Sequence, residues 1–129
     1  MINIAIIGAG YVGMSLAVLL SQDNIVDVLE IDATKVKKIN KKQSTIQDQD
    51  IEYFLQNKKL NLSATNLPKS AYKDKDLFLI ATPTDFNEKT NYFDASSVEM
   101  VIEDILQHSI AGLIVIKSTA VSYTHLRAH

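Results

Sequence analysis

The sequence predicts a doubly wound α/β domain, with about five parallel strands and helices on both faces of the sheet. Short apolar segments recur along the chain, as expected for strands that are buried on both faces. Segments with apolar residues at helical spacing separate them, and this alternation is typical of a parallel sheet. The 129 residues are enough for one domain with a complete hydrophobic core.

The start of the chain predicts two strands, each followed by a helix. Ile2–Ile7 and Val26–Ile31 are short, apolar and rich in β-branched residues, which favours buried strands. Tyr11–Gln22 and Ala33–Asn40 have apolar residues at helical spacing. Asp32 directly precedes the second helix and is a suitable N-cap for it.

The middle of the chain continues this alternation. Lys41–Asp48 is polar and predicts a loop, whereas Asp50–Asn57 has its apolar residues on one side and predicts a short helix. Leu60–Thr65 alternates apolar with polar residues, which is typical of a strand at a sheet edge. Pro68–Lys73 predicts a helix with proline in its first turn, and Leu77–Ala81 predicts another buried strand.

The last third adds one helix and one strand. Asp85–Phe93 is rich in polar residues and predicts a loop. Ala95–Gln107 has an apolar face at helical spacing, and Asp94 is a suitable N-cap for this amphipathic helix. Leu113–Ile116 is apolar and predicts the fifth strand of the sheet.

Composition excludes several kinds of site and partner. The chain has no Cys, which excludes disulfides, thiolate metal sites and a cysteine nucleophile within it. The net charge is −2 and no basic stripe is present, so nucleic acid is not an expected partner. No segment has the leader of a signal peptide or the roughly 20 apolar residues of a membrane span. We therefore expect a cytoplasmic protein that does not contact membranes.

A glycine-rich turn, Gly-Ala-Gly-Tyr-Val-Gly at residues 8–13, joins the first strand to the first helix. Gly8 permits a tight turn, Gly10 lets a pyrophosphate approach the backbone, and Gly13 lets the helix pack closely on the strand. The helix N-terminus offers free N–H groups and a partial positive charge to the phosphates. The turn in this context predicts a Rossmann-type dinucleotide site.

Two acids follow at the end of the second predicted strand, where such sites have a carboxylate for the adenosine ribose. A carboxylate there binds the ribose hydroxyls and repels a 2′-phosphate, which favours NAD over NADP. We expect Glu30 to bind the ribose and Asp32 to cap the next helix, with Asp32 as the alternative ribose ligand. Lys35, one helical turn beyond, is placed to face the adenosine side.

Further segments carry a resemblance to a known family. They are Ala-Thr-Pro-Thr at 81–84, Asn-Tyr-Phe-Asp at 91–94 and Ile-Lys-Ser-Thr at 116–119. Together with the glycine turn, their order and spacing resemble the N-terminal domain of the UDP-glucose 6-dehydrogenases, within the wider UDP-glucose/GDP-mannose dehydrogenase group. The resemblance covers residues 1–119.

The resemblance implies an enzyme that oxidises UDP-glucose at C6 to UDP-glucuronate, through a cysteine thioester and with reduction of two NAD per sugar. It also implies a homodimer for the full-length protein. The catalytic cysteine and the sugar-binding part are absent here, so we expect this chain to bind NAD without turnover. The alternatives are a related dehydrogenase of GDP-mannose or UDP-N-acetylmannosamine, and a non-catalytic NAD-sensing module.

Matching positions in the family imply NAD contacts at Val12, Glu30, Lys35, Thr84 and Thr119, with Thr119 near the nicotinamide. No catalytic residue and no metal site is assigned. The expected cofactor-binding residues are Gly8, Gly10, Tyr11, Val12, Gly13, Glu30, Asp32, Lys35, Thr82, Pro83, Thr84 and Thr119.

The sequence departs from the family pattern at two points that it contains. The ribose acid is usually Asp, and Glu30 is one methylene longer. After Thr119 the family has a Pro and a Gly, whereas residues 120–129 have neither. We expect residues 1–119 to form the NAD-binding domain and residues 120–129 to be a non-native or disordered tail, with a genuine divergent end as the alternative.

Overall fold

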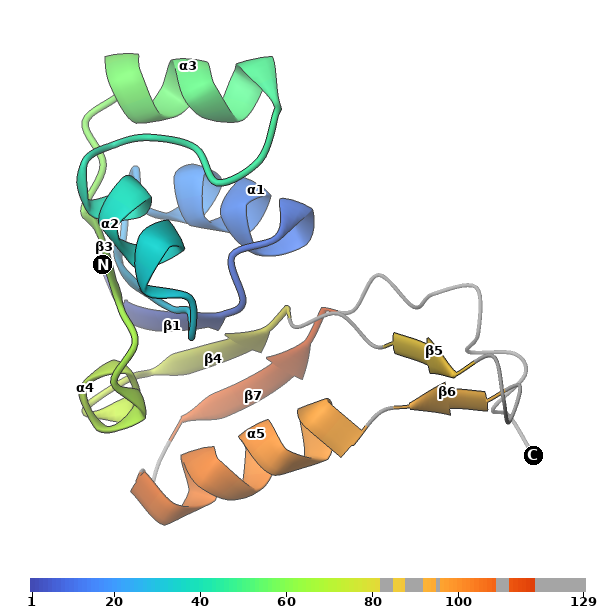
Figure 1. The fold of residues 1–129 in the computed structure, drawn as a ribbon. Coiled ribbons are helices and arrows are strands. Elements are labelled where there is room, and N and C mark those ends of the chain that lie inside the picture. The colour runs from blue at the N-terminus through green and yellow to red at the C-terminus, as the bar shows by residue number, and fades with distance from the viewer. Residues whose placement is uncertain (82–84, 88–91, 95, 109–111, 118–129) are drawn as a thin grey trace.

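The computed structural model describes residues 1–81, 85–87, 92–94, 96–108 and 112–117. A five-stranded parallel sheet lies at its centre, in the order β3-β2-β1-β4-β7 (Figure 1). The strands are β1 (Asn3–Ile7), β2 (Ile25–Leu29), β3 (Leu62–Thr65), β4 (Leu77–Ile80) and β7 (Leu113–Ile116). All four pairings between neighbours are parallel, which confirms the predicted doubly wound sheet.

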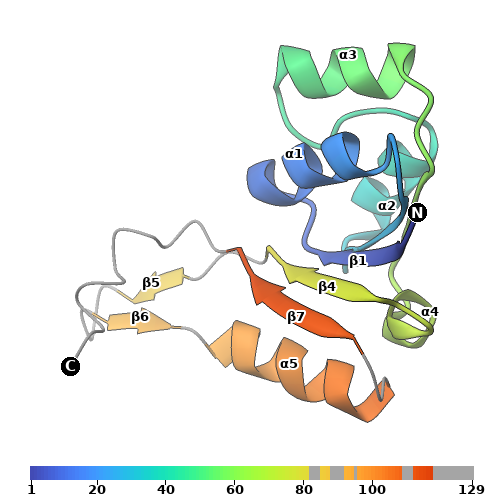
Figure 2. The same cartoon turned by 180° about the vertical axis from the view of Figure 1, so that it is seen from behind.

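Helices cover both faces of this sheet (Figures 1 and 2). The three helices on one face are α1 (Tyr11–Leu20), α2 (Ala33–Asn40) and α3 (Gln49–Asn57). The two on the other face are α4 (Pro68–Tyr72) and α5 (Ser96–His108). The predicted helices are therefore all present among the described residues, with ends that differ by up to two residues.

Each face of the sheet contributes to its own apolar core, because successive side chains of a strand point to opposite faces. Ile4 and Ile6 of β1 belong to the core with α1, α2 and α3. Ala5 and Ile7 of the same strand belong to the core with α4 and α5. Both faces of β1 are thus buried, which explains why its sequence is apolar without a polar alternation.

The predicted polar loop Asp85–Phe93 is wrong in part. Its two ends form the short strands β5 (Asp85–Asn87) and β6 (Tyr92–Asp94), which pair antiparallel with Phe86 in register with Phe93. Aromatic residues favour strands, and the polar residues between them concealed this tendency. Asp94 ends β6 two residues before α5 begins, so the N-cap position of α5 falls on residue 95, outside the described part.

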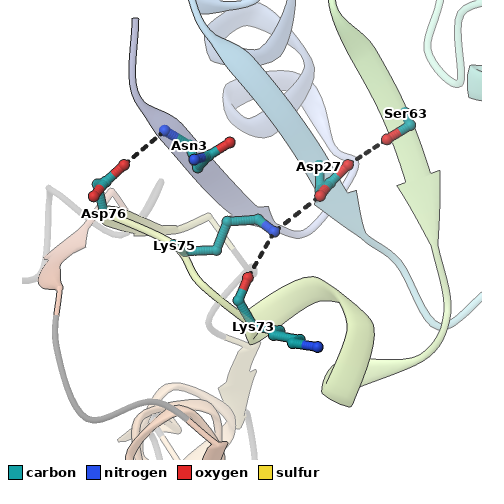
Figure 3. A network of polar contacts seen from close by, with 6 residues as sticks. All are labelled: Asn3, Asp27, Ser63, Lys73, Lys75 and Asp76. Carbon is teal, nitrogen blue, oxygen red and sulfur yellow. Dashed lines mark hydrogen bonds and ion pairs between the residues drawn. The ribbon is translucent and has the colours of Figure 1, made fainter.

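A polar network lies toward the amino end of the sheet and reaches Asp27 in the middle of β2 (Figure 3). Lys75 Nζ forms an ion pair with Asp27 Oδ2 at 2.9 Å and donates a hydrogen bond to the Lys73 carbonyl oxygen at 3.2 Å. Ser63 of β3 donates from its hydroxyl to the same Asp27 carboxylate. The network therefore connects β2, β3 and the segment that leads into β4 at the amino end of the sheet.

No helix within the described ranges has both the length and the apolar character that crossing a membrane requires.

Candidate functional site

The glycine turn lies at the carboxyl end of β1, between that strand and α1. The strand order reverses here, because β2 and β3 follow on one side of β1 while β4 and β7 follow on the other. Ligands of open α/β sheets bind in the crevice at such a point. The turn therefore occupies the position in the fold where the sequence predicted a dinucleotide.

Gly8 and Gly13 allow the turn to be as tight as it is. Gly8 has a φ of +108°, which is unfavourable for any residue with a side chain. Its N–H donates to the Leu29 carbonyl oxygen at 2.9 Å, which fixes the turn to the end of β2. A Cβ on Gly13 would lie 2.0 Å from the Gly8 carbonyl oxygen. Close packing of α1 on β1 thus depends on glycine at both positions.

Gly10 differs from these two because it lies beside open space. A Cβ built on Gly10 would meet no atom of the described residues within 4 Å. Gly10 is also the N-cap of α1, and its carbonyl oxygen accepts from Met14 N at 2.9 Å. A ligand can therefore approach the backbone here more closely than any side chain would allow, which fits the pyrophosphate of a dinucleotide.

Within the part of the chain that the structure describes, no side chain caps the N-terminus of α1, and its first turn contains no acidic residue. In contrast, Asp32 caps α2 by accepting from Thr34 N at 2.9 Å, as predicted, and Asp48 caps α3 by accepting from Ile51 N. A free helix N-terminus presents N–H donors and a partial positive charge. The end of α1 that faces the turn is therefore suited to bind an anion.

Tyr11 and Val12 form the first turn of α1 and differ in exposure. The Tyr11 side chain is 61% exposed. Val12 is partly buried and packs against the core that includes α1. Because its side chain is used in packing, what Val12 can offer to a phosphate is its backbone N–H.

Glu30, the first residue after β2, points its carboxylate at the glycine turn. Oε1 accepts from Ala9 N at 3.0 Å, and Oε2 accepts from Asp32 N at 3.0 Å. The Glu30 N–H donates to the Thr65 carbonyl oxygen at the end of β3. Of the two acids, Glu30 is therefore the one whose carboxylate contacts the turn, whereas the Asp32 carboxylate caps α2.

Lys35 lies in the first turn of α2 and is partly buried. Its helix begins directly after Asp32, which Glu30 contacts, and a role of Lys35 at the adenosine stays a prediction.

Four predicted residues lie outside the described part of the chain: Thr82, Pro83, Thr84 and Thr119. The strands that lead to them are described. Ile80 of β4 is paired with Ile7 of β1 and with Ile116 of β7, so the three strands end together. The carboxyl ends of β4 and β7 therefore lie at the side of the sheet that holds the glycine turn. The predicted tail at 120–129 lies outside the description as well.

Sequence reasoning missed Thr45. This residue is in the loop between α2 and α3, and its Oγ1 donates to the Ala9 carbonyl oxygen at 2.7 Å. The two residues are 36 positions apart, and nothing in the spacing of the polar loop predicts their contact. The fold alone places this hydroxyl on the glycine turn.

Comparison with known proteins agrees with this geometry. Residues 2–128 match the UDP-glucose/GDP-mannose dehydrogenase family, NAD binding domain. UDP-glucose 6-dehydrogenase of Streptococcus pneumoniae is 47% identical over 91% of this chain and 30% of its own length. The enzyme of that name from Campylobacter jejuni is 42% identical over 95% of this chain and 32% of its own length. The chain thus spans about a third of these relatives.

Solved structures share the fold. A GDP-mannose dehydrogenase from Pseudomonas aeruginosa superimposes with a TM-score of 0.79 at 30% identity, over 90% of this chain and 28% of that one. A UDP-glucose dehydrogenase from Pyrobaculum islandicum gives a TM-score of 0.79 at 22% identity, over 92% of this chain and 29% of that one. With its glycine turn and Glu30 arranged as described, the chain belongs to the UDP-glucose/GDP-mannose dehydrogenase family and contains that family's NAD binding domain.

Proposed function

We propose that NAD binds with its pyrophosphate over Gly10 at the N-terminus of α1 and its adenosine ribose at Glu30. The observation that carries this proposal is the open side of Gly10 beside a helix N-terminus that none of the described side chains caps. Gly8 and Gly13 shape the turn, and the backbone at Tyr11 and Val12 supplies N–H donors. When bound, NAD would supply the capacity to accept a hydride, and Glu30 and the backbone of the glycine turn would bind and orient it.

Glu30 gives the site its proposed preference for NAD over NADP. Its carboxylate lies at the turn, and a ribose 2′-phosphate would bring a second negative charge close to it. Ribose hydroxyls can instead donate to the carboxylate beside the N–H groups of Ala9 and Asp32, because its two oxygens accept more than one hydrogen bond each. Asp32 remains the alternative ribose ligand, although its carboxylate already caps α2.

Lys35, Thr82, Pro83, Thr84 and Thr119 remain proposed NAD contacts. The support for the threonines is the common edge at which β1, β4 and β7 end. Lys35 is supported by its place in the first turn of α2.

For the full-length protein we propose oxidation of UDP-glucose at C6 to UDP-glucuronate, with two NAD reduced per sugar. The support is the identity with two proteins named UDP-glucose 6-dehydrogenase. GDP-mannose and UDP-N-acetylmannosamine are the alternative substrates, because dehydrogenases of both share this fold. A non-catalytic NAD-sensing module is the alternative outside enzymes.

We expect this chain alone to be inactive, since it has no Cys to form a thioester. The full-length homodimer and the cytoplasmic location also remain predictions, as do the domain at 1–119 and the non-native tail at 120–129.

Calorimetric titration of the chain with NAD and with NADP tests the proposed site. We expect NAD to bind at least about tenfold more tightly, and we expect Glu30→Gln to remove most of this preference because it removes the charge. Glu52→Gln, at an exposed acid of α3, is the charge-matched control and should keep the preference. Equal affinities for the two cofactors in the unmodified chain would overturn the assignment of Glu30.

A further inference from the structure

The peptide groups on both sides of Ala9 are held by side chains from distant parts of the chain. Its N–H donates to Glu30 Oε1 at 3.0 Å, and its carbonyl oxygen accepts from Thr45 Oγ1 at 2.7 Å. Ala9 itself is only 1% exposed. The middle of the glycine turn is therefore fixed by two hydrogen bonds that have no counterpart in the glycine motif.

The carbonyl group of Ala9 and the N–H group of Gly10 belong to the same peptide unit. This unit is planar and trans, so the direction of its C=O determines the direction of its N–H. The Thr45 hydroxyl therefore sets the orientation of the Gly10 N–H, although it does not touch Gly10. The Gly10 N–H lies where the pyrophosphate is proposed to bind.

Thr45 can act in this way because its loop is itself well anchored. Ser44 Oγ donates to the Ile46 carbonyl oxygen at 2.6 Å and accepts from Ile46 N at 3.2 Å. Ile46 packs against the core on the α1 face of the sheet. Asp48 then caps α3, which fixes the end of the loop. These contacts hold the Thr45 hydroxyl at a defined position beside the Ala9 carbonyl oxygen.

We propose that Thr45 is a positioning residue for cofactor binding, which orients the Ala9–Gly10 peptide toward the pyrophosphate of NAD. This inference rests on the proposed NAD site. Its ligand is the diphosphate portion of the cofactor, so the effect of Thr45 should be confined to ligands that carry phosphate groups.

The test compares Thr45→Val, which keeps the shape and removes the hydroxyl, with Thr45→Ser, which keeps the hydroxyl. Each is titrated with NAD by calorimetry and with adenosine by NMR. We expect Thr45→Val to weaken NAD about five- to tenfold, the size of one lost hydrogen bond, and to leave adenosine binding unchanged. Thr45→Ser should restore NAD affinity to within about twofold of the unmodified chain.

Ser63→Ala is the control. The Ser63 hydroxyl also donates to a residue 36 positions away, but that residue is Asp27, in the polar network away from the glycine turn (Figure 3). NAD affinity should be unchanged in this variant.

Two results would overturn the role of Thr45. One is NAD affinity in Thr45→Val equal to that of the unmodified chain, and the other is an equal loss for NAD and adenosine, which would indicate a structural role only. If the unmodified chain itself failed to bind NAD, the proposed site would be wrong, and the role of Thr45 with it. The unmodified chain thus distinguishes the two failures.

Discussion

The two ends of the central sheet use their polar side chains differently. At the amino end, Lys75 pairs with Asp27, and Asp76 accepts a hydrogen bond from the first residue of β1 (Figure 3). At the carboxyl end, Glu30 and Thr45 bind the backbone of the glycine turn. Polar groups at the amino end satisfy one another. Those at the carboxyl end bind the glycine turn, and among the residues described here none caps the N-terminus of α1 with its side chain.

This difference predicts that the stability of the domain and its affinity for NAD depend on opposite ends of the sheet. Ligands of open α/β sheets bind at the carboxyl ends of the strands, so the amino end is free to hold the strands together. Substitutions at the amino end should therefore lower the free energy of unfolding without changing NAD affinity. The glycines at the carboxyl end test the same idea within one turn, because one should matter for stability and another for NAD affinity alone.

Gly13→Ala should have the largest effect of any change considered. Its Cβ would lie 2.0 Å from the Gly8 carbonyl oxygen, and this backbone atom cannot move without separating α1 from β1. We expect a loss of about 3 kcal/mol or more in the free energy of unfolding, together with loss of NAD binding. Urea denaturation and NAD calorimetry measure the two effects.

Gly10→Ala is the matched control within the same turn. Its Cβ meets no atom within 4 Å, and Gly10 has a φ of −81° that alanine adopts readily. The free energy of unfolding should therefore change by less than about 1 kcal/mol, while NAD affinity falls because the Cβ occupies the path of the pyrophosphate. Normal NAD binding by Gly10→Ala would contradict the proposed close approach. Normal stability of Gly13→Ala would contradict the packing argument.

Lys75→Met probes the other end of the sheet. The Lys75 side chain is only 7% exposed, and its loss leaves the Asp27 carboxylate, 27% exposed, without its cation. We expect a loss of about 2 kcal/mol in the free energy of unfolding, measured by urea denaturation. NAD affinity should stay within about twofold of the unmodified chain, since the network lies away from the turn.

The double variant Lys75→Met with Asp27→Asn is its control, because it removes both charges at once. It should recover part of the lost stability, since no unpaired carboxylate is left. A fall in NAD affinity in Lys75→Met would show that the two ends of the sheet are coupled. It would contradict the idea that stability and NAD affinity depend on different ends.

Most of the fold could be predicted because it depends on local patterns. Apolar segments such as Ile2–Ile7 are buried on both faces, and helical spacing marks Tyr11–Gln22 as a helix, so the periodicity alone indicates their type. The glycine turn could also be predicted, because the spacing of its glycines directly after a buried strand is a local pattern. Asp32 as N-cap of α2 was likewise predicted and is confirmed.

The parts that could not be predicted depend on contacts between distant segments. Thr45 reaches Ala9 only because the fold brings the loop after α2 over the turn. Lys75 meets Asp27 only because the fold places the segment before β4 where the long Lys75 side chain can reach β2. The pairing of β5 with β6 was hidden for a related reason, since the polar residues between them outweighed the aromatic ones in the sequence pattern.

The pH dependence of the free energy of unfolding also involves the amino end of the sheet, through Tyr72, and this is the smallest effect that we expect. Tyr72 is almost fully buried near the amino end, where its ring packs edge to face with Phe78. Burial, the negative charge of Asp104 and a hydrogen bond to it raise the pKa of Tyr72 from 10.0 to about 12. Because the folded-state pKa is the higher one, the stability contributed by the neutral phenol is complete below pH 10 and is lost as the pH rises to 12.

Between pH 9 and pH 11 the unmodified chain should therefore lose about 1 kcal/mol more of its free energy of unfolding than Tyr72→Phe does. Urea denaturation at the two pH values measures this difference. Tyr53→Phe, at a tyrosine of α3 whose side chain is 54% exposed, retains Tyr72 and should keep the full loss. Equal losses in Tyr72→Phe and in the unmodified chain would show that the burial of this phenol does not link the amino end to pH. A difference confined to Tyr72→Phe would show that this end of the sheet responds to pH through one tyrosine, apart from the carboxyl end where NAD is proposed to bind.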